Sequence, residues 1–173
     1  MEFADLQEIE KALGKGLPRV LRTLLVSDGT VTRFLEAYFQ EPILIHVEKH
    51  QEQLGSSPLA IELKFCVDER ILIREVELQG SLTKHCYAKA RSWLRLSRLD
   101  REIQTSFQQK QWGIGELLSD RRVESYREIL GFWIEGAGEQ QVVARSYRIW
   151  IRSEPTILIE ERFPLGSYCG ESE

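Results

Sequence analysis

The chain has 173 residues, of which 42% are hydrophobic and 29% are charged, and its formal net charge at pH 7 is −4. This length and composition predict one globular domain, residues 1–173, with one core. The acidic balance disfavours a nucleic-acid partner, because such binders are usually basic, and no apolar run approaches the roughly 20 residues that a membrane-spanning helix needs.

The first 40 residues are predicted to be helical. Apolar residues spaced three and four apart predict a short helix over 6–13, ended by Gly14, and a second helix from Pro18 to Leu25. The sequence SDGT at 27–30 is a break built from turn and capping residues. A third amphipathic helix is predicted over 31–39, where the apolar positions follow i, i+3, i+4, i+7 and i+8.

From Pro42 onward the apolar period changes to two, which is typical of strands. Strands are predicted over 42–50, 60–65, 71–78, 85–96, 141–151 and 156–163. The last two are joined by a short turn at Ser153–Pro155 and form a predicted hairpin. Residues 97–107 have a helical pattern, whereas 122–136 fits either a helix or a strand. Tandem strands with few helices between them favour an antiparallel sheet, so the predicted fold class is α+β.

The cysteines do not predict a disulfide framework. Cys66, Cys86 and Cys169 are odd in number and have no CxxC spacing, which indicates a reducing compartment and argues against a zinc site. The N-terminal sequence MEFADLQEIEKAL begins with acidic residues and lacks the basic-then-apolar order of a signal peptide. We therefore expect a cytoplasmic protein without membrane insertion.

Other candidate sites have weak support in the sequence. The histidines at 46, 50 and 85 have no metal-ligand spacing, so no metal is predicted. Ser27 is followed by Asp28 and Gly29, but no histidine is placed to activate a nucleophile, and a helix cap explains the motif better. The sequence GIG at 113–115 is too short for a phosphate-binding loop.

One strand carries a charge where an apolar residue is expected. In ILIREVEL, residues 71–78, alternate side chains share a face, so Leu72, Val76 and Leu78 form an apolar row with Arg74 in its middle. A buried charge without a partner costs several kcal/mol. Arg74 therefore needs an anionic partner.

The last two strands show the same anomaly. Glu161 shares a face with Ile157, Ile159 and Phe163, and Arg145 lies in an apolar row of the preceding strand. One interpretation is a structural ion pair, or a row that turns to solvent at a sheet edge. The other is a pocket for a small anion, since the planar guanidinium binds a carboxylate bidentately and a glutamate can hold a hydroxyl or move a proton. The pattern alone leaves both open.

Four segments in register carry a resemblance to a known family. LLVSDGTVTRFLEAY, ILIREVEL, WGIGELL and ILIEERFP resemble the chorismate lyases (chorismate–pyruvate lyase, 4-hydroxybenzoate synthase), and most of all their cyanobacterial and algal-plastid branch. The resemblance covers about residues 17–168. It implies a single antiparallel sheet with helices packed on it around an enclosed ligand cavity.

The resemblance also implies a reaction. Chorismate loses its enolpyruvyl group as pyruvate and leaves 4-hydroxybenzoate, with no metal or organic cofactor, and the product feeds quinone synthesis of the plastoquinone type. The partners expected are this substrate and product only, with no nucleic acid and no membrane, and the protein is expected to be a monomer. The family chemistry fits a site without a triad, because positioning and electrostatic stabilisation suffice for it.

The resemblance also implies site residues, through their positions in the matching segments. Arg74 matches the family arginine that binds a ligand carboxylate, and Glu161 matches the glutamate that meets the ring hydroxyl, as acid/base or orienting group. Glu160 is an alternative that an alignment could select, but face parity and the following Phe163 favour Glu161. Substrate-binding positions also match at Thr30, Ile114 and, with a less defined role, Arg145.

The chain departs from the family at two points. The segment WGIG lacks the proline found before it in some relatives. Arg91 has a counterpart in the ubiquinone-pathway enzymes, but parity places it opposite Ala90 and Ser92, so it is left out of the site.

Two further functions remain as alternatives. Effector domains of GntR-type regulators share the fold, so the cavity could sense an aromatic acid without turnover. This chain, however, has no DNA-binding helix-turn-helix before the predicted sheet. A structural protein with a buried Arg–Glu pair and no ligand is the third possibility.

Overall fold

The computed structural model describes residues 4–108 and 113–169. Its strands are β1 (Ile43–Leu54), β2 (Arg70–Gly80), β3 (Cys86–Arg95), β4 (Ser125–Glu135), β5 (Val142–Ile151) and β6 (Glu154–Pro164). Its α-helices are α1 (Leu6–Leu13), α2 (Arg19–Val26), α3 (Val31–Phe39), α4 (Ser57–Leu63), α5 (Arg101–Gln108) and α6 (Ile114–Asp120). Short 3₁₀ turns lie at Leu96–Arg98, Gly138–Gln140 and Leu165–Tyr168.

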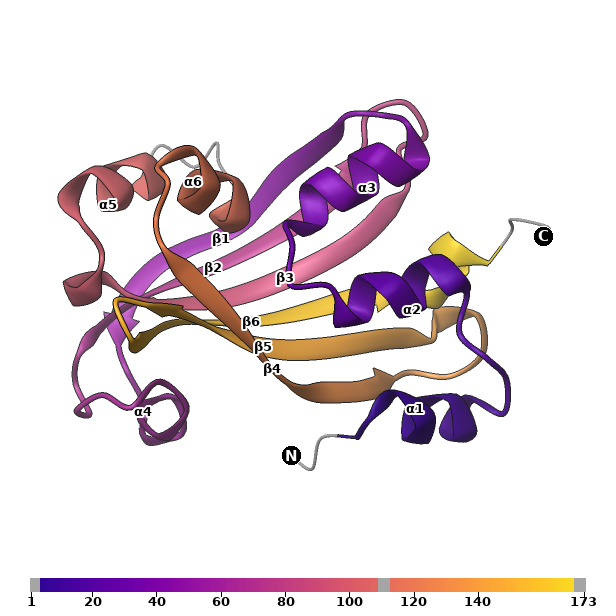
Figure 1. Ribbon diagram of the computed structural model, residues 1–173, viewed down its shortest axis with the longest axis horizontal. Helices are drawn as coiled ribbons and strands as arrows, with labels where there is room; N and C mark the ends of the chain where they lie inside the picture. Colours follow the sequence, from indigo (N-terminus) through magenta and orange to yellow (C-terminus); the bar gives the residue numbers. More distant parts are fainter. Residues whose placement is uncertain (1–3, 109–112, 170–173) are drawn as a thin grey trace.

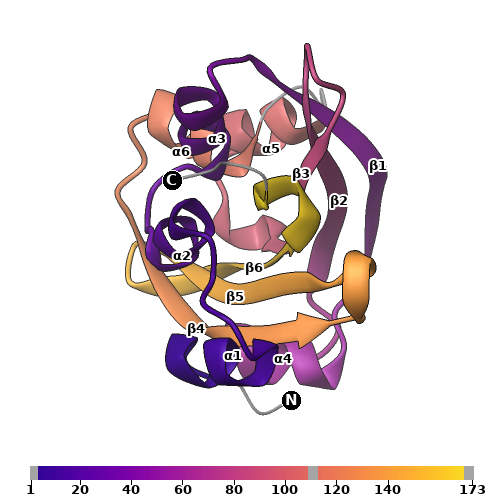
Figure 2. The same ribbon diagram turned by 90° about the vertical axis from the view of Figure 1, so that its right-hand side faces the viewer.

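The six strands form one antiparallel sheet in the order β1-β2-β3-β6-β5-β4. The sheet curves around the helices α2, α3, α5 and α6, which cover its concave face (Figures 1 and 2). Helix α4 packs on the opposite face and α1 lies beside β4 (Figure 2). The predicted α+β class and antiparallel sheet are therefore confirmed.

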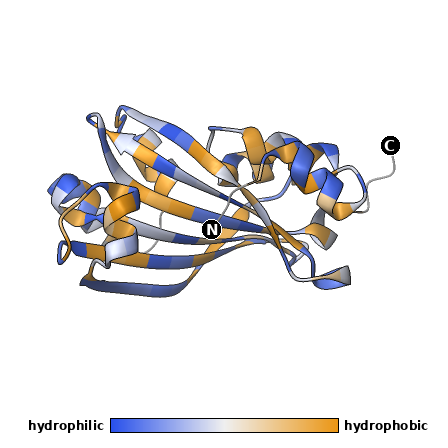
Figure 3. Cartoon of the chain, turned by 90° about the horizontal axis from the view of Figure 1, so that it is seen from below, coloured by the Kyte–Doolittle hydropathy of each residue, from blue (hydrophilic) through white to orange (hydrophobic). Residues whose placement is uncertain are grey.

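Hydrophobic residues on the concave face form two separate clusters. The first joins α1, α2 and α3 to one end of the sheet through residues such as Leu24, Leu78 and Phe163. The second joins α5 and α6 to the other end through residues such as Phe107 and Ile157. Hydrophobic and hydrophilic residues alternate along the strands (Figure 3), as a sheet with two different faces requires. The two clusters leave the middle of the concave face for other residues.

A smaller cluster lies under α4 on the outer face. Ile71 and Ile73 of β2 contact Trp93, Leu158 and helix α4, and this contact explains why the second face of ILIREVEL begins apolar. The outer face becomes acidic only beyond the helix, at Glu75 and Glu77, which are half-buried. The helix therefore protects only part of the outer face of β2.

The segment AIELKF, residues 60–65, was predicted as a strand, and this prediction is wrong. Pro58 in the first turn and Lys64 in the left-handed conformation at the C-cap delimit α4. Leu63 is fully buried, whereas Ile61 is 75% exposed, which a strand with both on one row would not give. A helical spacing of four between Leu59 and Leu63 therefore defines the contact with the sheet.

The hairpin turn also differs from the sequence prediction. The hairpin turn is Arg152–Ser153, both with positive φ, and Ile151 pairs directly with Glu154. Positive φ at both central residues is the signature of a type I′ turn, whose twist matches the strands. Because the turn is this short, Pro155 lies inside β6.

The segment 122–136, which the sequence left open between helix and strand, contains β4. Trp112, part of WGIGELL, lies outside the described residues. No helix in the described ranges is long and apolar enough to span a membrane.

Candidate active site

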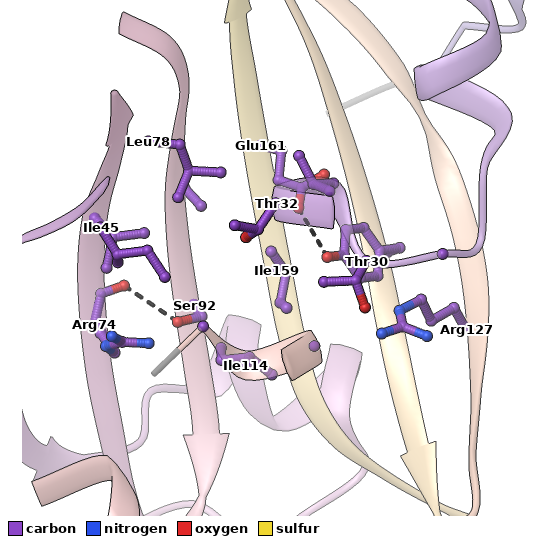
Figure 4. A pocket seen from close by; sticks show the side chains of 17 residues that line it. Thr30, Thr32, Ile45, Arg74, Leu78, Ser92, Ile114, Arg127, Ile159 and Glu161 are labelled. Atoms are coloured by element: carbon purple, nitrogen blue, oxygen red, sulfur yellow. Dashed lines mark hydrogen bonds between the residues drawn. The ribbon is translucent and has the colours of Figure 1, made fainter. Parts of the chain in front are cut away.

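A polar band separates the two hydrophobic clusters on the concave face. It consists of Arg74 on β2, Ser92 on β3, Glu161 on β6 and Arg145 on β5, all buried. Cross-strand pairing sets their alignment, because Arg74 lies opposite Ser92 and Glu161 lies opposite Arg145. A cavity of about 60 Å³ opens over this band, walled by β1 to β6, the start of α3 and the start of α6 (Figure 4). The small side chains Ala90 and Ser92 lie at its base.

Arg74 is a buried cation with no ion-pair partner among the residues that the structure describes. Its side chain is 2% exposed, and Nε and Nη2 make no hydrogen bond to any residue that the structure describes. Burial lowers its pKa to about 10, so the guanidinium still carries its charge at neutral pH. The ring of Phe107 from α5 lies 6.0 Å from its central carbon. The site thus holds a desolvated positive charge that an anion can neutralise.

Glu161 is held from two sides. Arg145 Nε donates to Oε2 at 2.7 Å, and Tyr147 Oη donates to Oε1 at 2.9 Å. Burial, together with the neighbouring carboxylate, raises the pKa of Tyr147, so the phenol stays a donor. Burial alone would lower the pKa of Arg145, but the paired carboxylate raises it above its ordinary value. Since a carboxylate accepts about four hydrogen bonds, Glu161 keeps capacity for a ligand hydroxyl.

Arg145 does not line the cavity, although the sequence analysis assigned it a substrate contact. Its Nη1 donates to the carbonyl oxygens of Leu24, Leu25 and Ser27 at 2.7, 2.8 and 2.8 Å. These carbonyls lie at the C-terminal end of α2, where helices leave acceptors unsatisfied. Arg145 therefore forms with Glu161 the structural ion pair that the sequence allowed, whereas Arg74 lines the cavity and has no ion-pair partner among the described residues.

Thr30 and Ile114 lie in the cavity wall, where the resemblance placed them. Thr30 precedes α3 and makes no capping bond with its side chain, and Ile114 begins α6. Gly115 brings the two segments close, because a Cβ there would lie 3.0 Å from Thr30 Oγ1. Glycine at 115 therefore permits a close approach that a methyl group would crowd, between α6 and the residue before α3.

Glu160 and Arg91 belong to the other face of the sheet. Glu160 accepts a bond from Arg162 at 3.1 Å, and Arg91 pairs with Glu75 at 3.3 Å. Neither lines the cavity over the polar band. The parity argument that preferred Glu161 to Glu160 agrees with this placement.

Sequence reasoning missed Arg127 of β4, which lines the cavity opposite Arg74 (Figure 4). It escaped notice because 122–136 fitted a helix as well as a strand. A strand assignment would have exposed the signal, since Arg127 and the apolar Ile129 then share a face. Tyr147, the second donor to Glu161, also lies in the wall, and its parity with Arg145 was its only signal.

A family model described as "Chorismate pyruvate-lyase Rv2949c-like" matches residues 25–168. The chain belongs to this family. The Rv2949c-like match extends from the end of α2 to the last 3₁₀ turn, so it includes every strand of the sheet and every residue of the polar band. The cyanobacterial and plastid branch is not part of this finding.

Individual proteins agree with the family assignment. The chorismate pyruvate-lyase of Mycobacterium leprae (strain TN) is 29% identical over 158 residues, which cover 85% of this chain and 75% of that protein. The chorismate pyruvate-lyase of Mycobacterium tuberculosis (strain CDC 1551 / Oshkosh) is 25% identical over 183 residues, covering 93% and 85%.

A solved structure shares the fold of this lyase-family chain at low identity. The effector domain of PhnF from Mycobacterium smegmatis superimposes with a TM-score of 0.64 at 10% identity, covering 80% of this chain and 90% of that one. Identity this low shows the fold alone, and function rests on the residues of the site.

Proposed function

We propose that the chain is a chorismate lyase that converts chorismate into 4-hydroxybenzoate and pyruvate. One observation carries the proposal. Arg74, a buried arginine with no ion-pair partner in the described part of the chain, shares a small cavity with the buried carboxylate Glu161, in a chain of the chorismate pyruvate-lyase family. A ring with a carboxylate at one end and a hydroxyl at the other satisfies both groups at once.

The spacing of the strands suits such a ring. Arg74 lies on β2 and Glu161 on β6, with β3 between them. Two strand spacings, about 10 Å in total, therefore separate their backbones. Ala90 and Ser92 on β3 leave room for the ring below the two charged side chains. Ile114 and Ile159 provide apolar walls for its faces. The carboxylate binds Arg74 and the hydroxyl donates to Glu161.

The reaction needs positioning more than it needs reactive groups. The ether bond between the ring and the enolpyruvyl oxygen breaks, the ring loses the proton on the hydroxyl-bearing carbon, and the enolpyruvyl carbon gains a proton to become the methyl group of pyruvate. Aromatisation supplies the driving force. Arg74 fixes the ring carboxylate, and the buried cavity replaces water around the ether with fixed dipoles.

We assign Glu161 the role of orienting the hydroxyl. Arg145 and Tyr147 each donate to one of its oxygens and hold the carboxylate in place. The remaining lone pairs of these oxygens are available to a ligand hydroxyl. Arg145 is then a positioning residue, which acts on the ligand only through Glu161.

The finer parts of the proposal rest on the resemblance of the four sequence segments. We propose that 4-hydroxybenzoate from this enzyme feeds quinone synthesis of the plastoquinone type, in a branch like that of cyanobacteria and algal plastids. The enzyme is proposed to act as a single-domain monomer in the cytoplasm. It is proposed to use no metal and no organic cofactor.

The test is a direct assay of the purified chain. Chorismate is incubated with the protein in the presence of EDTA, and 4-hydroxybenzoate and pyruvate are followed together. Equal amounts of both are expected, with loss of at least about 100-fold in rate in Arg74→Ala and Glu161→Gln. Absence of both products from a folded wild type would overturn the proposal, and unchanged turnover in Arg74→Ala would remove Arg74 from the site.

A second function has one observation in its favour, the fold shared with a protein that is called an effector domain. On this view the cavity binds an aromatic acid and no reaction follows. Calorimetric binding of 4-hydroxybenzoate or chorismate, with chorismate recovered unchanged, would support this function over the lyase.

A further inference from the structure

We propose that Arg127 forms a second anion subsite in the same cavity and makes the site selective for dianions over monoanions. The inference deepens the proposed function, on which it rests for its natural ligand: the subsite would take the enolpyruvyl carboxylate of chorismate. It concerns a residue that the family resemblance did not assign.

The first argument is the contact state of Arg127. The side chain is half-buried and lines the cavity, and its Nε is fully buried without a hydrogen-bond partner among the described residues. A guanidinium has five N–H donors, and a buried donor without an acceptor costs free energy. An anion in the cavity would satisfy it, as for Arg74.

The second argument is the charge balance of the site. Arg74 and Arg127 line the cavity together with Glu161, which is the only acidic residue among the described cavity-lining residues. Arg145, outside the cavity lining, forms an ion pair with Glu161. Arg145 and Glu161 neutralise each other, and two positive charges remain uncompensated. A ligand with two negative charges completes the balance, whereas a monoanion leaves one guanidinium unpaired.

The third argument is the position of the two free arginines. They project into the cavity from β2 and β4, on opposite sides of Glu161 on β6 (Figure 4). A ligand with two carboxylates on different arms can pair with both guanidinium groups and place its hydroxyl near Glu161 between them.

The fourth argument is a convergence of donors beside Arg127. A Cβ built on Gly115 would lie 3.2 Å from Arg127 Nη2 and 3.0 Å from Thr30 Oγ1, so both groups approach the same point. Val31 and Thr32, in the first turn of α3, also line the cavity, and the first N–H groups of a helix have no acceptor within it. These groups add donors to the subsite that Arg127 defines.

The subsite has a consequence for the reaction. Cleavage of the ether converts one dianion into two monoanions, and each then pairs with one arginine only. Pyruvate is released from the Arg127 side and 4-hydroxybenzoate stays with Arg74 and Glu161. The affinity of the site for its substrate is thus higher than for its aromatic product.

The test compares two stable probes by calorimetry: 4-hydroxybenzoate, a monoanion, and 3-(carboxymethoxy)-4-hydroxybenzoate, a dianion that carries its second carboxylate on an ether arm. We expect the wild type to bind the dianion at least about 10-fold more tightly. Arg127→Met is expected to lower the affinity for the dianion by about 10- to 100-fold and to change the affinity for the monoanion by less than about threefold. Arg127→Lys should recover part of the dianion affinity, since it keeps the charge and loses the fork.

Two further variants separate this effect from loss of charge or fold. Arg152→Met removes an exposed arginine of the hairpin turn, whose partner is Asp100, and should leave both affinities unchanged. Gly115→Ala should lower the affinity for the dianion more than that for the monoanion, because the methyl group crowds Arg127 and Thr30. Equal weakening of both probes in Arg127→Met, or no weakening of either, would overturn the subsite.

Turnover distinguishes failure of the subsite from failure of the lyase. If the wild type converts chorismate and Arg127→Met keeps its KM and both probe affinities, the subsite is wrong and the lyase stands. If the wild type does not convert chorismate but selects the dianion through Arg127, the lyase is wrong and the subsite stands. Binding of neither probe by the wild type overturns both.

Discussion

Arg145 joins the end of a helix to the carboxylate in the middle of the sheet. Its Nε donates to Glu161 at 2.7 Å, and its Nη1 donates to the carbonyl oxygens of Leu24, Leu25 and Ser27 at the C-terminus of α2. The donors of the guanidinium group thus have acceptors on two sides, the Glu161 carboxylate and the carbonyls at the end of α2. The position of Glu161 in the cavity therefore depends on the packing of α2 against the sheet.

This relationship predicts that Arg145→Met destabilises the protein. Glu161 would stay buried at 6% exposure with only Tyr147 as donor. The carbonyls of Leu25 and Ser27 would lose the Arg145 donor, whereas that of Leu24 would keep the N–H of Ser27. Breaking a buried pair from one side costs about 3–5 kcal/mol, to be measured as the free energy of unfolding in urea. The double variant Arg145→Met, Glu161→Gln should recover part of the loss. A decrease below about 1 kcal/mol in the single variant would contradict the structural role.

Arg74→Met should act in the opposite direction on stability. Arg74 is buried and pairs with no carboxylate within residues 4–108 and 113–169, so its removal abolishes a desolvation cost. The free energy of unfolding of the ligand-free protein is expected to rise by about 1–3 kcal/mol. The same change should abolish stabilisation by 4-hydroxybenzoate in a thermal-shift experiment. Arg162→Met, on the outer face, is the control that should keep that stabilisation. A less stable Arg74→Met would show that the guanidinium has a partner in solution.

The pKa of Arg74 predicts an alkaline limb in the pH profile. Its folded-state pKa of about 10 lies below the ordinary 12.5, so the charged form is disfavoured in the ligand-free protein and is lost as pH rises through about 10. An anion binds only the charged form, so kcat/KM should fall over that range. Arg74→Lys should move the limb to lower pH, because the same burial acts on a group whose ordinary pKa is already about 10.4. A profile flat to pH 11 in the wild type would exclude Arg74 from anion binding.

The hydrogen bonds to Glu41, away from the site, predict that the stability of the fold falls at acid pH. Burial raises the pKa of Glu41, but hydrogen bonds from Thr83, Tyr87 and Leu82 outweigh it, and the pKa falls to about 2. The folded pKa lies below the unfolded value, so this stabilisation is full above about pH 4.5 and is lost as pH falls toward 2.

Glu41→Gln should therefore unfold at lower urea concentration than the wild type at pH 7. The difference between the two proteins should shrink when both are measured near pH 2.5. Glu48→Gln, which changes an exposed carboxylate, serves as control. A difference that does not depend on pH would contradict the assignment.

The sequence predicted the faces of strands better than it predicted contacts between them. Strict alternation placed Arg74 and Glu161 on the concave face and Glu160 on the other, because each side chain has only two choices in a strand. Helix α4 was missed, since AIELKF fits a period of two as well as a contact through Leu59 and Leu63. Alternation is ambiguous in segments this short.

The partner of Glu161 could not be predicted from alternation. Arg145 and Arg74 have the same parity, and both were candidates for a substrate contact. What separates them is the end of α2, which lies about 120 residues from Arg145 in sequence and supplies three acceptors to it alone. Arg127 was missed for a related reason: its strand was recognised only through pairing with β5.

The division of the concave face into two hydrophobic clusters and a polar band also bears on how this fold diversifies. Stability is supplied at both ends of the sheet, where each cluster has its own helices, and the band between them contributes charges rather than apolar area. Within the band, Arg74 makes no hydrogen bond to a described helix, whereas Arg145 is bonded to the end of α2, so the position of Arg74 is the more easily exchanged. One scaffold can in this way adopt new ligands through a few substitutions at a shared central position, which is compatible with a neighbour of the same fold at 10% identity.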